Sequence, residues 1–372
     1  MKTAAVGITG QSGFIGTHLT NFLGIKKDLV KIIPCNRGYF SNPLQLSNFV
    51  SNCDVIVHLA AMNRGDPQEI YECNVSLVRQ LIESMEQTGC TPHVIFSSST
   101  QETLDNAYGR SKAEGRCLFE AWAKKTGGKF TCLVIPNVFG PFGRPFHNSV
   151  VSTFCYQLTH DQQPKIEIDA SLNFIYVGAV VNTIYSIITG TVHDPTVFLQ
   201  PQATIRVSGI LSKLKDYAHS YLERGIIPDV TDRFELDLFN TFRSYLEHSH
   251  FPVIPECKKD DRGYLIELVK EKSGGQAFFS LTRPGVTRGN HFHARKIERF
   301  CVISGDALIR MRRIGTTEVV EYSVSGNNPG YVDIPLWYTH TITNVGTADL
   351  TTLFWTNELF DPENPDTYHE NV

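Results

Sequence analysis

Tyr108 and Lys112 stand four residues apart, and their side chains point to proton-transfer chemistry. On a helix this spacing places both side chains on one face. A lysine ammonium beside a phenol favours the phenolate, so we expect Tyr108 to exchange a proton nearer neutral pH than its ordinary pKa of about 10. The run of hydroxyl residues Ser97–Ser99 ends an apolar stretch shortly before this pair. Together these side chains predict general acid chemistry on a bound molecule.

A second group of reactive side chains lies in the last third of the chain. His291 and His293 are separated by one residue, and in a strand this spacing directs both imidazoles to one face. Glu298 and His340 add a carboxylate and a further imidazole, a ligand set that suits a divalent transition metal such as zinc. The alternative is that these are unconnected core or surface residues.

A glycine-rich turn near the N-terminus is the first element needed to position Tyr108. The apolar run Ala4–Ile8 leads into this turn, where Gly10, Gly13 and Gly16 have the spacing G-x-x-G-x-x-G. Such glycines allow a tight turn and let backbone N–H groups approach a pyrophosphate at a helix N-terminus. We therefore predict a dinucleotide site, with an ordinary tight turn as the alternative.

The end of the second predicted strand, Val30–Cys35, indicates which dinucleotide binds. An acidic residue here would bind the ribose 2′-hydroxyl of NAD, but the chain continues with Asn36 and Arg37. An arginine suits a 2′-phosphate, so NADPH is favoured over NADH unless Arg37 is a solvated surface residue. The later run Asp54–Ala61 ends in small residues that let a cofactor lie close.

The order of the predicted elements indicates two kinds of domain. Strands alternate with helices through the first two-thirds of the chain, which predicts a parallel, doubly wound α/β sheet. A short Pro-bearing segment follows, and then eight short β runs typical of a sandwich or jelly roll. We predict a cofactor domain over residues 1–247, a linker over 248–256 and an all-β domain with the metal site over 257–372.

Composition and charge exclude several classes of protein. The chain has 372 residues, 41% hydrophobic and 19% charged, which suits a folded enzyme of two domains. Its formal net charge of -4 offers no basic surface for nucleic acid or an anionic membrane. The nine cysteines include no C-x-x-C pair, which favours reduced thiols. We find neither a signal peptide nor an apolar run of the roughly 20 residues that span a bilayer, so we expect a cytoplasmic protein.

The motif order resembles the extended short-chain dehydrogenase/reductase family of nucleotide-sugar enzymes. TGxxGFIG, VIVHLAA, FSSS, YxxxK and PNVFGP occur in that family's order. The resemblance implies a Rossmann-type sheet, with Ser99 bonding the carbonyl that is reduced and Tyr108 donating the proton. Lys112 would hold the nicotinamide ribose and lower the Tyr108 pKa, while Ser98 or Thr100 remains an alternative to Ser99. The implied dinucleotide-binding residues are Gly10, Gly13, Phe14, Ile15, Gly16, Arg37, Leu59, Ala60 and Lys112.

Departures from that family lie on the substrate side. Relatives often have an arginine before PNVFGP, where this chain has Val134 and Ile135. They often have Y-V-D-D where this chain reads Y-V-G-A over 176–179. Asn137 and Asn148 are the polar candidates for binding the sugar nucleotide, with turn or capping roles as the alternative.

The histidine spacing resembles the cupin family of jelly-roll proteins. The resemblance places the metal on His291, His293, Glu298 and His340. One departure is Trp337, which stands where glycine is usual, and a tryptophan there would either narrow the pocket or form a stacking wall.

The segment 284–291 is also similar to cupin-type keto-sugar epimerases, which remove a proton next to a ketone. In those enzymes the residue matching His291 is the base, but a metal-bound imidazole cannot also be a free base. Asp261 or a metal-bound water is therefore expected to take the proton.

A reductase of this type fused to such a cupin resembles the bifunctional enzymes of bacterial capsular polysaccharide synthesis. The likeness implies that the cupin epimerises C3 of a UDP-4-keto-6-deoxy-HexNAc and that the reductase then reduces C4 with NADPH. The product would be UDP-2-acetamido-2,6-dideoxy-L-talose, on the route to UDP-N-acetyl-L-fucosamine, and the enzyme a homodimer. The alternatives are a nucleotide-sugar 4-epimerase or dehydratase, and a reductase whose cupin is a dimerisation or regulatory module.

Overall fold

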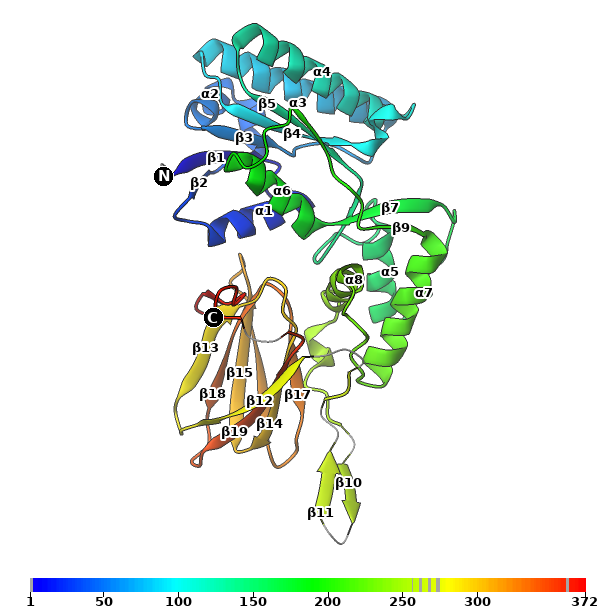
Figure 1. The fold of residues 1–372 in the computed structure, drawn as a ribbon, viewed down its shortest axis with the longest axis vertical. Helices are drawn as coiled ribbons and strands as arrows, with labels where there is room; N and C mark the ends of the chain where they lie inside the picture. Colours follow the sequence, from blue (N-terminus) through cyan, green and yellow to red (C-terminus); the bar gives the residue numbers. More distant parts are fainter. Residues whose placement is uncertain (1–2, 256, 261–262, 267–268, 272–274, 359–360) are drawn as a thin grey trace. The chain divides into compact units, whose positions relative to one another are not determined.

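The computed structural model describes residues 3–255, 257–260, 263–266, 269–271, 275–358 and 361–372 (Figure 1). The chain divides into two compact units. The first comprises residues 1–150 and 169–207, and the second comprises residues 151–168 and 208–372. Residues 208–247 thus pack in the same unit as the C-terminal strands, and the predicted domain ranges 1–247 and 257–372 stay a prediction.

A six-stranded parallel sheet forms the centre of the first unit, in the order β2-β1-β3-β4-β5-β8. The strands are β1 (Ala4–Thr9), β2 (Val30–Ile33), β3 (Val55–His58), β4 (His93–Ser99), β5 (Phe130–Ile135) and β8 (Thr196–Phe198). Every residue of β3 and β4 is buried, as expected for central parallel strands covered on both faces. The predicted Rossmann-type α/β sheet is confirmed.

Helices cover both faces of this sheet (Figure 1). One layer contains α2 (Pro43–Ser51), α3 (Pro67–Thr88) and α4 (Ala107–Thr126), and the other contains α1 (Phe14–Ile25) and α6 (Val177–Ile188). Asn106 caps α4 by accepting from the Gly109 N–H at 2.8 Å, and Gly127 ends the helix with a φ of 73°. Two short 3₁₀ segments, η1 (Arg37–Ser41) and η2 (Thr100–Thr103), follow β2 and β4. A separate small sheet contains β6 (Asn137–Phe139), β7 (Ser171–Tyr176) and β9 (Ala203–Arg206).

The second unit combines helices with an antiparallel β-sandwich. Its sheets have the strand orders β12-β19-β14-β17 and β16-β15-β18-β13-β20. The strands are β12 (Gln276–Thr282), β13 (Thr287–Phe292), β14 (Glu298–Ser304), β15 (Asp306–Arg313), β16 (Val319–Ser325), β17 (Tyr331–Ile334), β18 (Tyr338–Asn344), β19 (Leu350–Thr356) and β20 (Tyr368–His369). A hairpin of β10 (Cys257–Asp260) and β11 (Gly263–Ile266) precedes them, and the helical elements are α5 (Val150–Thr159), α7 (Val207–Tyr217), η3 (Ala218–Glu223), α8 (Arg233–Arg243) and η4 (His248–His250). The predicted all-β C-terminal region is confirmed.

A buried ionic cluster joins the helices of the second unit to its sandwich. Arg299 on β14 and Asp333 on β17, 0% and 1% exposed, pair through bonds of 2.7 and 3.0 Å. Tyr221 of η3 donates to the same carboxylate, and the Arg243 guanidinium at the end of α8 donates to the Ile334 carbonyl at 2.9 Å. These contacts tie residues 208–247 to the β strands.

Two expectations about the chain as a whole can be compared with the fold. Among the described residues, we find no helix with the combined length and apolarity that a membrane span requires. The cysteines whose side chains the structure describes are all free, in line with the prediction of reduced thiols.

Candidate active sites

Tyr108 and Lys112 lie in the first turns of α4, which brings their side chains together as the spacing predicts. Lys112 is 4% exposed. Its ammonium donates to the Ser97 carbonyl at 2.7 Å and lies 5.5 Å from the centre of the Tyr108 ring. The end of β4 therefore fixes the lysine in place beside the phenol.

Burial shifts the two pKa values in opposite directions. It raises the pKa of Tyr108 to about 12 and lowers the pKa of Lys112 to about 8, because a buried site disfavours the charged form of each group. The expected lowering of the Tyr108 pKa by Lys112 is therefore wrong for this structure, in which burial of the phenol dominates. A tyrosine held in its protonated form is suited to donate a proton rather than to take one.

The hydroxyls at the end of β4 differ in the hydrogen bonds that they already make. Ser97 Oγ donates to a backbone carbonyl at 3.0 Å, and Ser98 Oγ donates to a glutamate carboxylate at 2.6 Å. Ser99 Oγ instead accepts from the N–H of Gln101 at 3.2 Å, which leaves its own proton available. This difference favours Ser99 over Ser98 as the donor to a carbonyl, whereas Thr100 is exposed at the start of η2.

A buried histidine that the motif-based interpretation did not use, His58, joins two strand ends beside this site. Its Nδ1 lies 2.8 Å from Thr9 Oγ1, which also accepts from the Ala60 N–H at 3.3 Å. Burial, and to a smaller extent the Lys112 charge, lowers the pKa of His58 to about 3. The imidazole is therefore neutral and connects β1 to β3 without placing a second cation near Lys112. The position of His58 at the end of a predicted strand is the sequence feature that could have identified it.

The glycine turn between β1 and α1 leaves little room for side chains. Gly10 has a φ of 73°, and a Cβ there would lie 2.8 Å from the backbone nitrogen of Ala60. A Cβ at Gly16 would lie 2.2 Å from the carbonyl oxygen of Gly10. Gly13 is the N-cap of α1, and no side chain caps that helix end. Phe14 and Ile15 open the helix, and no side chain accepts from its first N–H groups among the described residues.

The other predicted cofactor residues lie at the ends of neighbouring strands. Arg37 is exposed at the start of η1, just after β2, and Asn36 caps that segment. Leu59 and Ala60 directly follow β3 and are half-buried. Because β2, β1 and β3 are adjacent and parallel, these residues share one edge of the sheet with the glycine turn.

The two predicted substrate residues already bond to backbone carbonyls. Asn137 Nδ2 donates to the Asn173 carbonyl at 3.2 Å. Asn148, with a φ of 55°, donates from Nδ2 to the Asn63 carbonyl at 2.5 Å. These bonds give each amide a local structural role, and a role in substrate binding stays a prediction.

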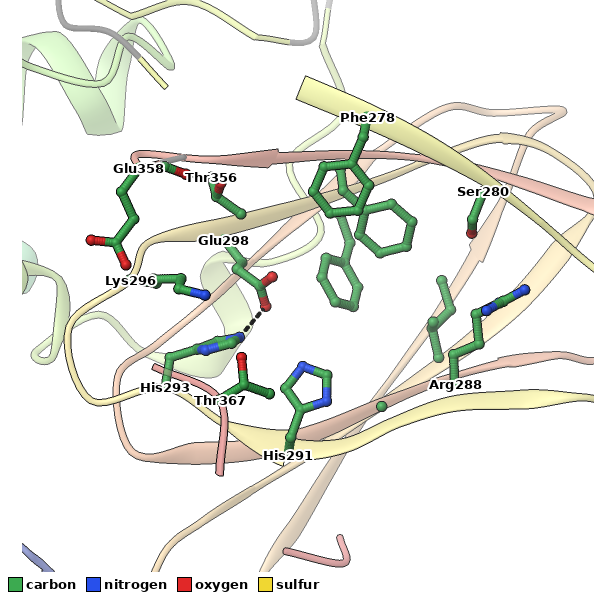
Figure 2. Close-up of a pocket in the computed structure, with 14 residues that line it drawn as sticks. Phe278, Ser280, Arg288, His291, His293, Lys296, Glu298, Thr356, Glu358 and Thr367 are labelled. Carbon is green, nitrogen blue, oxygen red and sulfur yellow. Dashed lines mark hydrogen bonds and ion pairs between the residues drawn. The ribbon is translucent and has the colours of Figure 1, made fainter. Parts of the chain in front are cut away.

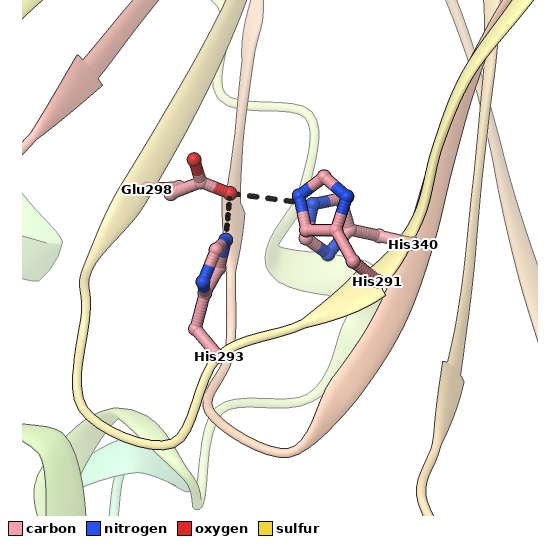
Figure 3. A group of neighbouring side chains, drawn as sticks. All are labelled: His291, His293, Glu298 and His340. Atoms are coloured by element: carbon pink, nitrogen blue, oxygen red, sulfur yellow. Dashed lines mark hydrogen bonds and ion pairs between the residues drawn. The ribbon is translucent and has the colours of Figure 1, made fainter. Parts of the chain in front are cut away.

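The second unit brings the four predicted metal ligands together (Figure 3). One ligand atom from each of the four residues lies within 4.8 Å of all the others. They come from three strands or their ends: His291 and His293 from β13, Glu298 from β14 and His340 from β18. Burial, followed by the neighbouring histidines, lowers the pKa of His291 to about 4, so its imidazole is neutral and able to act as a ligand.

The hydrogen bonds around this cluster direct two imidazole nitrogens toward one carboxylate oxygen. His293 Nδ1 lies 2.5 Å from the Asp366 carbonyl oxygen, and His340 Nδ1 lies 3.2 Å from the Tyr338 carbonyl oxygen. A carbonyl only accepts, so in the neutral rings Nδ1 carries the proton and Nε2 has a lone pair. Both Nε2 atoms face Glu298 Oε2, at 2.8 and 3.2 Å, and His340 Nε2 is buried with no hydrogen-bond partner among the described residues.

When both rings are neutral, the three converging acceptor atoms repel one another unless a cation lies between them. A proton on His293 Nε2 also relieves this repulsion: although burial lowers the pKa of His293, its hydrogen bond to Glu298 raises that pKa overall. The donor set of imidazole and carboxylate, with histidines held by backbone carbonyls, fits zinc or a similar divalent ion.

A cavity of about 290 Å³ opens beside the cluster (Figure 2). Phe278, Phe300 and Phe354 provide apolar lining, and the polar lining includes His291, Lys296 and Glu298. Trp337 is not part of this lining; it packs against Phe292, with ring centres 5.5 Å apart, and has a φ of 61°. That conformation explains why glycine suits the position. Asp261, the predicted proton acceptor, lies outside the described residues.

The C-terminal segment completes the cluster, which the sequence did not indicate. The Asp366 carboxylate accepts from the backbone N–H groups of Ala294, Arg295 and Lys296 at 3.0–3.1 Å. Its carbonyl bonds His293, and β20 pairs with β13 at His291. One buried aspartate thus holds both the turn between β13 and β14 and a metal-ligand imidazole.

Known proteins are similar to the chain over both units. Residues 6–198 match the model of the NAD dependent epimerase/dehydratase family, and residues 258–368 match that of the polysaccharide biosynthesis C-terminal domain. A UDP-2-acetamido-2,6-beta-L-arabino-hexul-4-ose reductase from Pseudomonas aeruginosa is 32% identical over 364 residues, which cover 97% of each chain.

Two further similarities concern the whole chain and its C-terminal part. The crystal structure of the capsular polysaccharide assembling protein CapF from Staphylococcus aureus has 34% identity and a TM-score of 0.65, covering 99% of this chain and 100% of that one. The spore coat polysaccharide biosynthesis protein SpsL from Bacillus subtilis is 29% identical over 119 residues, which cover 29% of this chain and 78% of that protein.

Proposed function

The chain belongs to the NAD dependent epimerase/dehydratase family, and from this premise we propose that it is a bifunctional nucleotide-sugar enzyme. In the proposal the C-terminal β domain epimerises C3 of a UDP-4-keto-6-deoxy-HexNAc, and the N-terminal domain then reduces the C4 ketone with NADPH. The product is a UDP-2-acetamido-2,6-dideoxy-L-talose-type sugar for capsular polysaccharide synthesis. The observation that carries the proposal is that one chain combines the Tyr108 site with four convergent metal-ligand atoms beside a cavity.

The proposed reduction uses the hydroxyls at the start of α4 and the end of β4. NADPH, when bound, supplies the hydride. Ser99 and Tyr108 donate hydrogen bonds to the ketone oxygen, and Tyr108 delivers its proton as the alkoxide forms. Burial keeps Tyr108 protonated, since it raises the pKa to about 12. The name of the Pseudomonas relative, a hexul-4-ose reductase, supports a C4 ketone as the reducible group.

The proposed cofactor site lies at the edge of the sheet where the glycine turn joins β1 to α1. The restricted space at Gly10 and Gly16 and the N-terminus of α1 without a capping side chain suit a pyrophosphate. Arg37, exposed after β2, suits the 2′-phosphate of NADPH. Lys112 holds the nicotinamide ribose.

The proposed epimerisation comes first for a chemical reason. The C4 ketone makes the C3 proton acidic, and reduction removes that ketone. His291, His293, Glu298 and His340 would hold a divalent metal, which either polarises an oxygen or ties strands together. Four protein ligands leave little room for substrate, so we favour a cation that ties β13, β14 and β18 together.

Incubation of the full chain with a UDP-4-keto-6-deoxy-HexNAc in deuterated water tests both halves of the proposal. Deuterium at C3 without NADPH supports the epimerase, and NADPH oxidation supports the reductase. Oxidation without deuterium incorporation leaves a reductase whose β domain is a dimerisation or regulatory module. If neither signal appears, the proposal is refuted. We also propose a homodimer, which sedimentation of the purified protein would measure.

Matched variants separate the roles within each half. Tyr108→Phe is expected to lose NADPH oxidation and keep deuterium incorporation. His291→Ala tests the metal. If that protein stays folded and loses only deuterium incorporation, the metal is catalytic and its proposed structural role is wrong.

A further inference from the structure

Glu102 connects three elements that surround the Tyr108 site. It lies in η2, between β4, which ends at Ser99, and α4, which carries Tyr108. Its Oε2 accepts from Ser98 Oγ at 2.6 Å, and its Oε1 accepts from the Arg116 guanidinium at 2.9 Å. The side chain is 13% exposed. One oxygen of this carboxylate thus holds the end of β4, and the other holds α4.

The alternation of side chains along β4 separates Ser98 from Ser99. Successive side chains of a strand point to opposite faces, and Ser99 is still extended, with a φ of -143° and a ψ of 151°. Ser98 therefore shares a face with Phe96, whose ring centre lies 5.5 Å from that of Phe119 in α4. Glu102 accepts from the serine on the α4 face, which leaves Ser99 as the one able to donate to a ketone.

The first turn of α4 lies directly against η2. A Cβ at Gly109 would lie 2.1 Å from the carbonyl oxygen of Gln101 and 2.9 Å from that of Leu104. The N–H of Gln101 also donates to Ser99 Oγ at 3.2 Å. Because Gly109 directly follows Tyr108, a shift of η2 against α4 would move the Ser99 hydroxyl relative to the Tyr108 hydroxyl.

Arg116 gives the Glu102 carboxylate a fixed partner on α4. It lies about two helical turns after Tyr108. Its guanidinium also donates to Thr196 Oγ1 of β8 at 3.1 Å and to Glu120 Oε1 at 2.8 Å. The position of Arg116 is thus set by bonds outside η2, and its charge-assisted bond to Glu102 fixes η2 in turn.

We propose that Glu102 is a positioning residue for the reduction, because its carboxylate holds η2 where the Ser99 and Tyr108 hydroxyls converge on one ketone oxygen. This inference rests on the proposed function, in which Ser99 donates a hydrogen bond and Tyr108 delivers the proton. Glu102 touches neither the sugar nor the cofactor, and it transfers no proton. A misplacement of about 1 Å in a catalytic site lowers the rate about 10²-fold, so the expected effect is on kcat.

The test measures NADPH oxidation with a UDP-4-keto-6-deoxy-HexNAc in the full-length wild type, Glu102→Ala, Glu102→Gln and Glu120→Ala. Glu120→Ala is the matched control: Glu120 also pairs with Arg116, but among the described residues it has no hydrogen bond to η2 or β4. We expect Glu102→Ala to lower kcat about 10²-fold, with KM and NADPH affinity within about threefold of wild type. Glu102→Gln has one acceptor oxygen for two donors, so its kcat is expected to be intermediate. Glu120→Ala is expected to match the wild type.

A double-mutant cycle with Ser99→Ala distinguishes positioning from a purely structural role. If Glu102 acts by placing Ser99, then Glu102→Ala lowers kcat by less than about threefold further in the Ser99→Ala background. A loss that is fully additive overturns the inference. If Glu102→Ala does not fold, Glu102→Gln, which conserves the size of the side chain, provides the same comparison.

The remaining outcomes also decide between the two proposals. The inference is overturned if Glu102→Ala and Glu102→Gln keep the kcat of the wild type, if they change only KM or NADPH affinity, or if Glu120→Ala loses as much kcat as Glu102→Ala. In these cases an active wild type leaves the proposed reductase standing. If the wild type oxidises no NADPH with this sugar, the proposed reductase fails, and this inference fails with it.

Discussion

Replacing Lys112 by methionine removes a buried charge, so it tests separately the effect of that charge on stability and its role in the proposed reduction. Burial lowers the pKa of Lys112 from 10.5 to about 8. The folded state therefore binds this proton more weakly than the unfolded state does. At about 1.36 kcal/mol per unit, the ammonium destabilises the fold by about 3 kcal/mol at neutral pH. That destabilisation disappears as pH rises through the interval from about 8 to 10.5, so the contribution of Lys112 to stability increases with pH.

The measurement is the free energy of unfolding in urea at pH 7 and at pH 10. The wild type is expected to gain about 2 to 3 kcal/mol more than Lys112→Met between these pH values, since the variant lacks the titrating group. At pH 7 the variant is expected to be as stable as the wild type or up to about 2 kcal/mol more stable, because it also leaves the Ser97 carbonyl without its donor. NADPH oxidation is expected to be lost.

Lys215→Met, which changes an exposed lysine of α7, is the control, and its free energy of unfolding is expected to follow that of the wild type at both pH values. Other titrating groups are common to all three proteins, so the difference isolates Lys112. If Lys112→Met shows the same pH dependence as the wild type, or is several kcal/mol less stable at pH 7, the assignment of a destabilising buried ammonium is incorrect.

Three shorter predictions concern the other sites. Tyr108→Phe is expected to lower kcat for NADPH oxidation about 10²–10⁴-fold with unchanged NADPH affinity, measured by cofactor fluorescence, and a loss of affinity instead would contradict a role as proton donor. Asp366→Ala removes the acceptor for three N–H groups and is expected to lower both metal content and melting temperature, which metal analysis and calorimetry would check. Asp333→Ala leaves Arg299 buried without its carboxylate and is expected to cost about 3–5 kcal/mol in urea unfolding, whereas a loss below about 1 kcal/mol would show that water reaches the site.

Features that depend on residues close in sequence could be predicted without a structure. The spacing of Tyr108 and Lys112 places them on one helix face. The spacing of the glycines between β1 and α1 predicts the tight turn in which they lie. The alternation of strands and helices predicted the parallel sheet, and the short β runs that follow predicted the β-sandwich. The His-x-His pattern, together with Glu298, predicted most of the metal cluster, because β13 and β14 are joined by a short turn.

Burial changed the chemistry expected from the Tyr108 and Lys112 motif. The sequence predicted a phenol made more acidic by a neighbouring ammonium, but burial raises the pKa of Tyr108 to about 12. The ammonium donates to a carbonyl of β4 instead. Spacing along a helix indicates which groups meet, whereas their ionisation depends on how much water the surrounding strands and helices exclude.

The sequence by itself determined the kinds of domain, the glycine turn, the pairing of Tyr108 with Lys112 and the metal-ligand set. Only the tertiary structure decided which serine keeps a free proton and that Asp366 orients His293 from 73 residues away. The physical reason is the range of the interactions. Helix faces and turns follow from local backbone geometry, but hydrogen bonds and burial depend on segments that meet only when the sheets assemble.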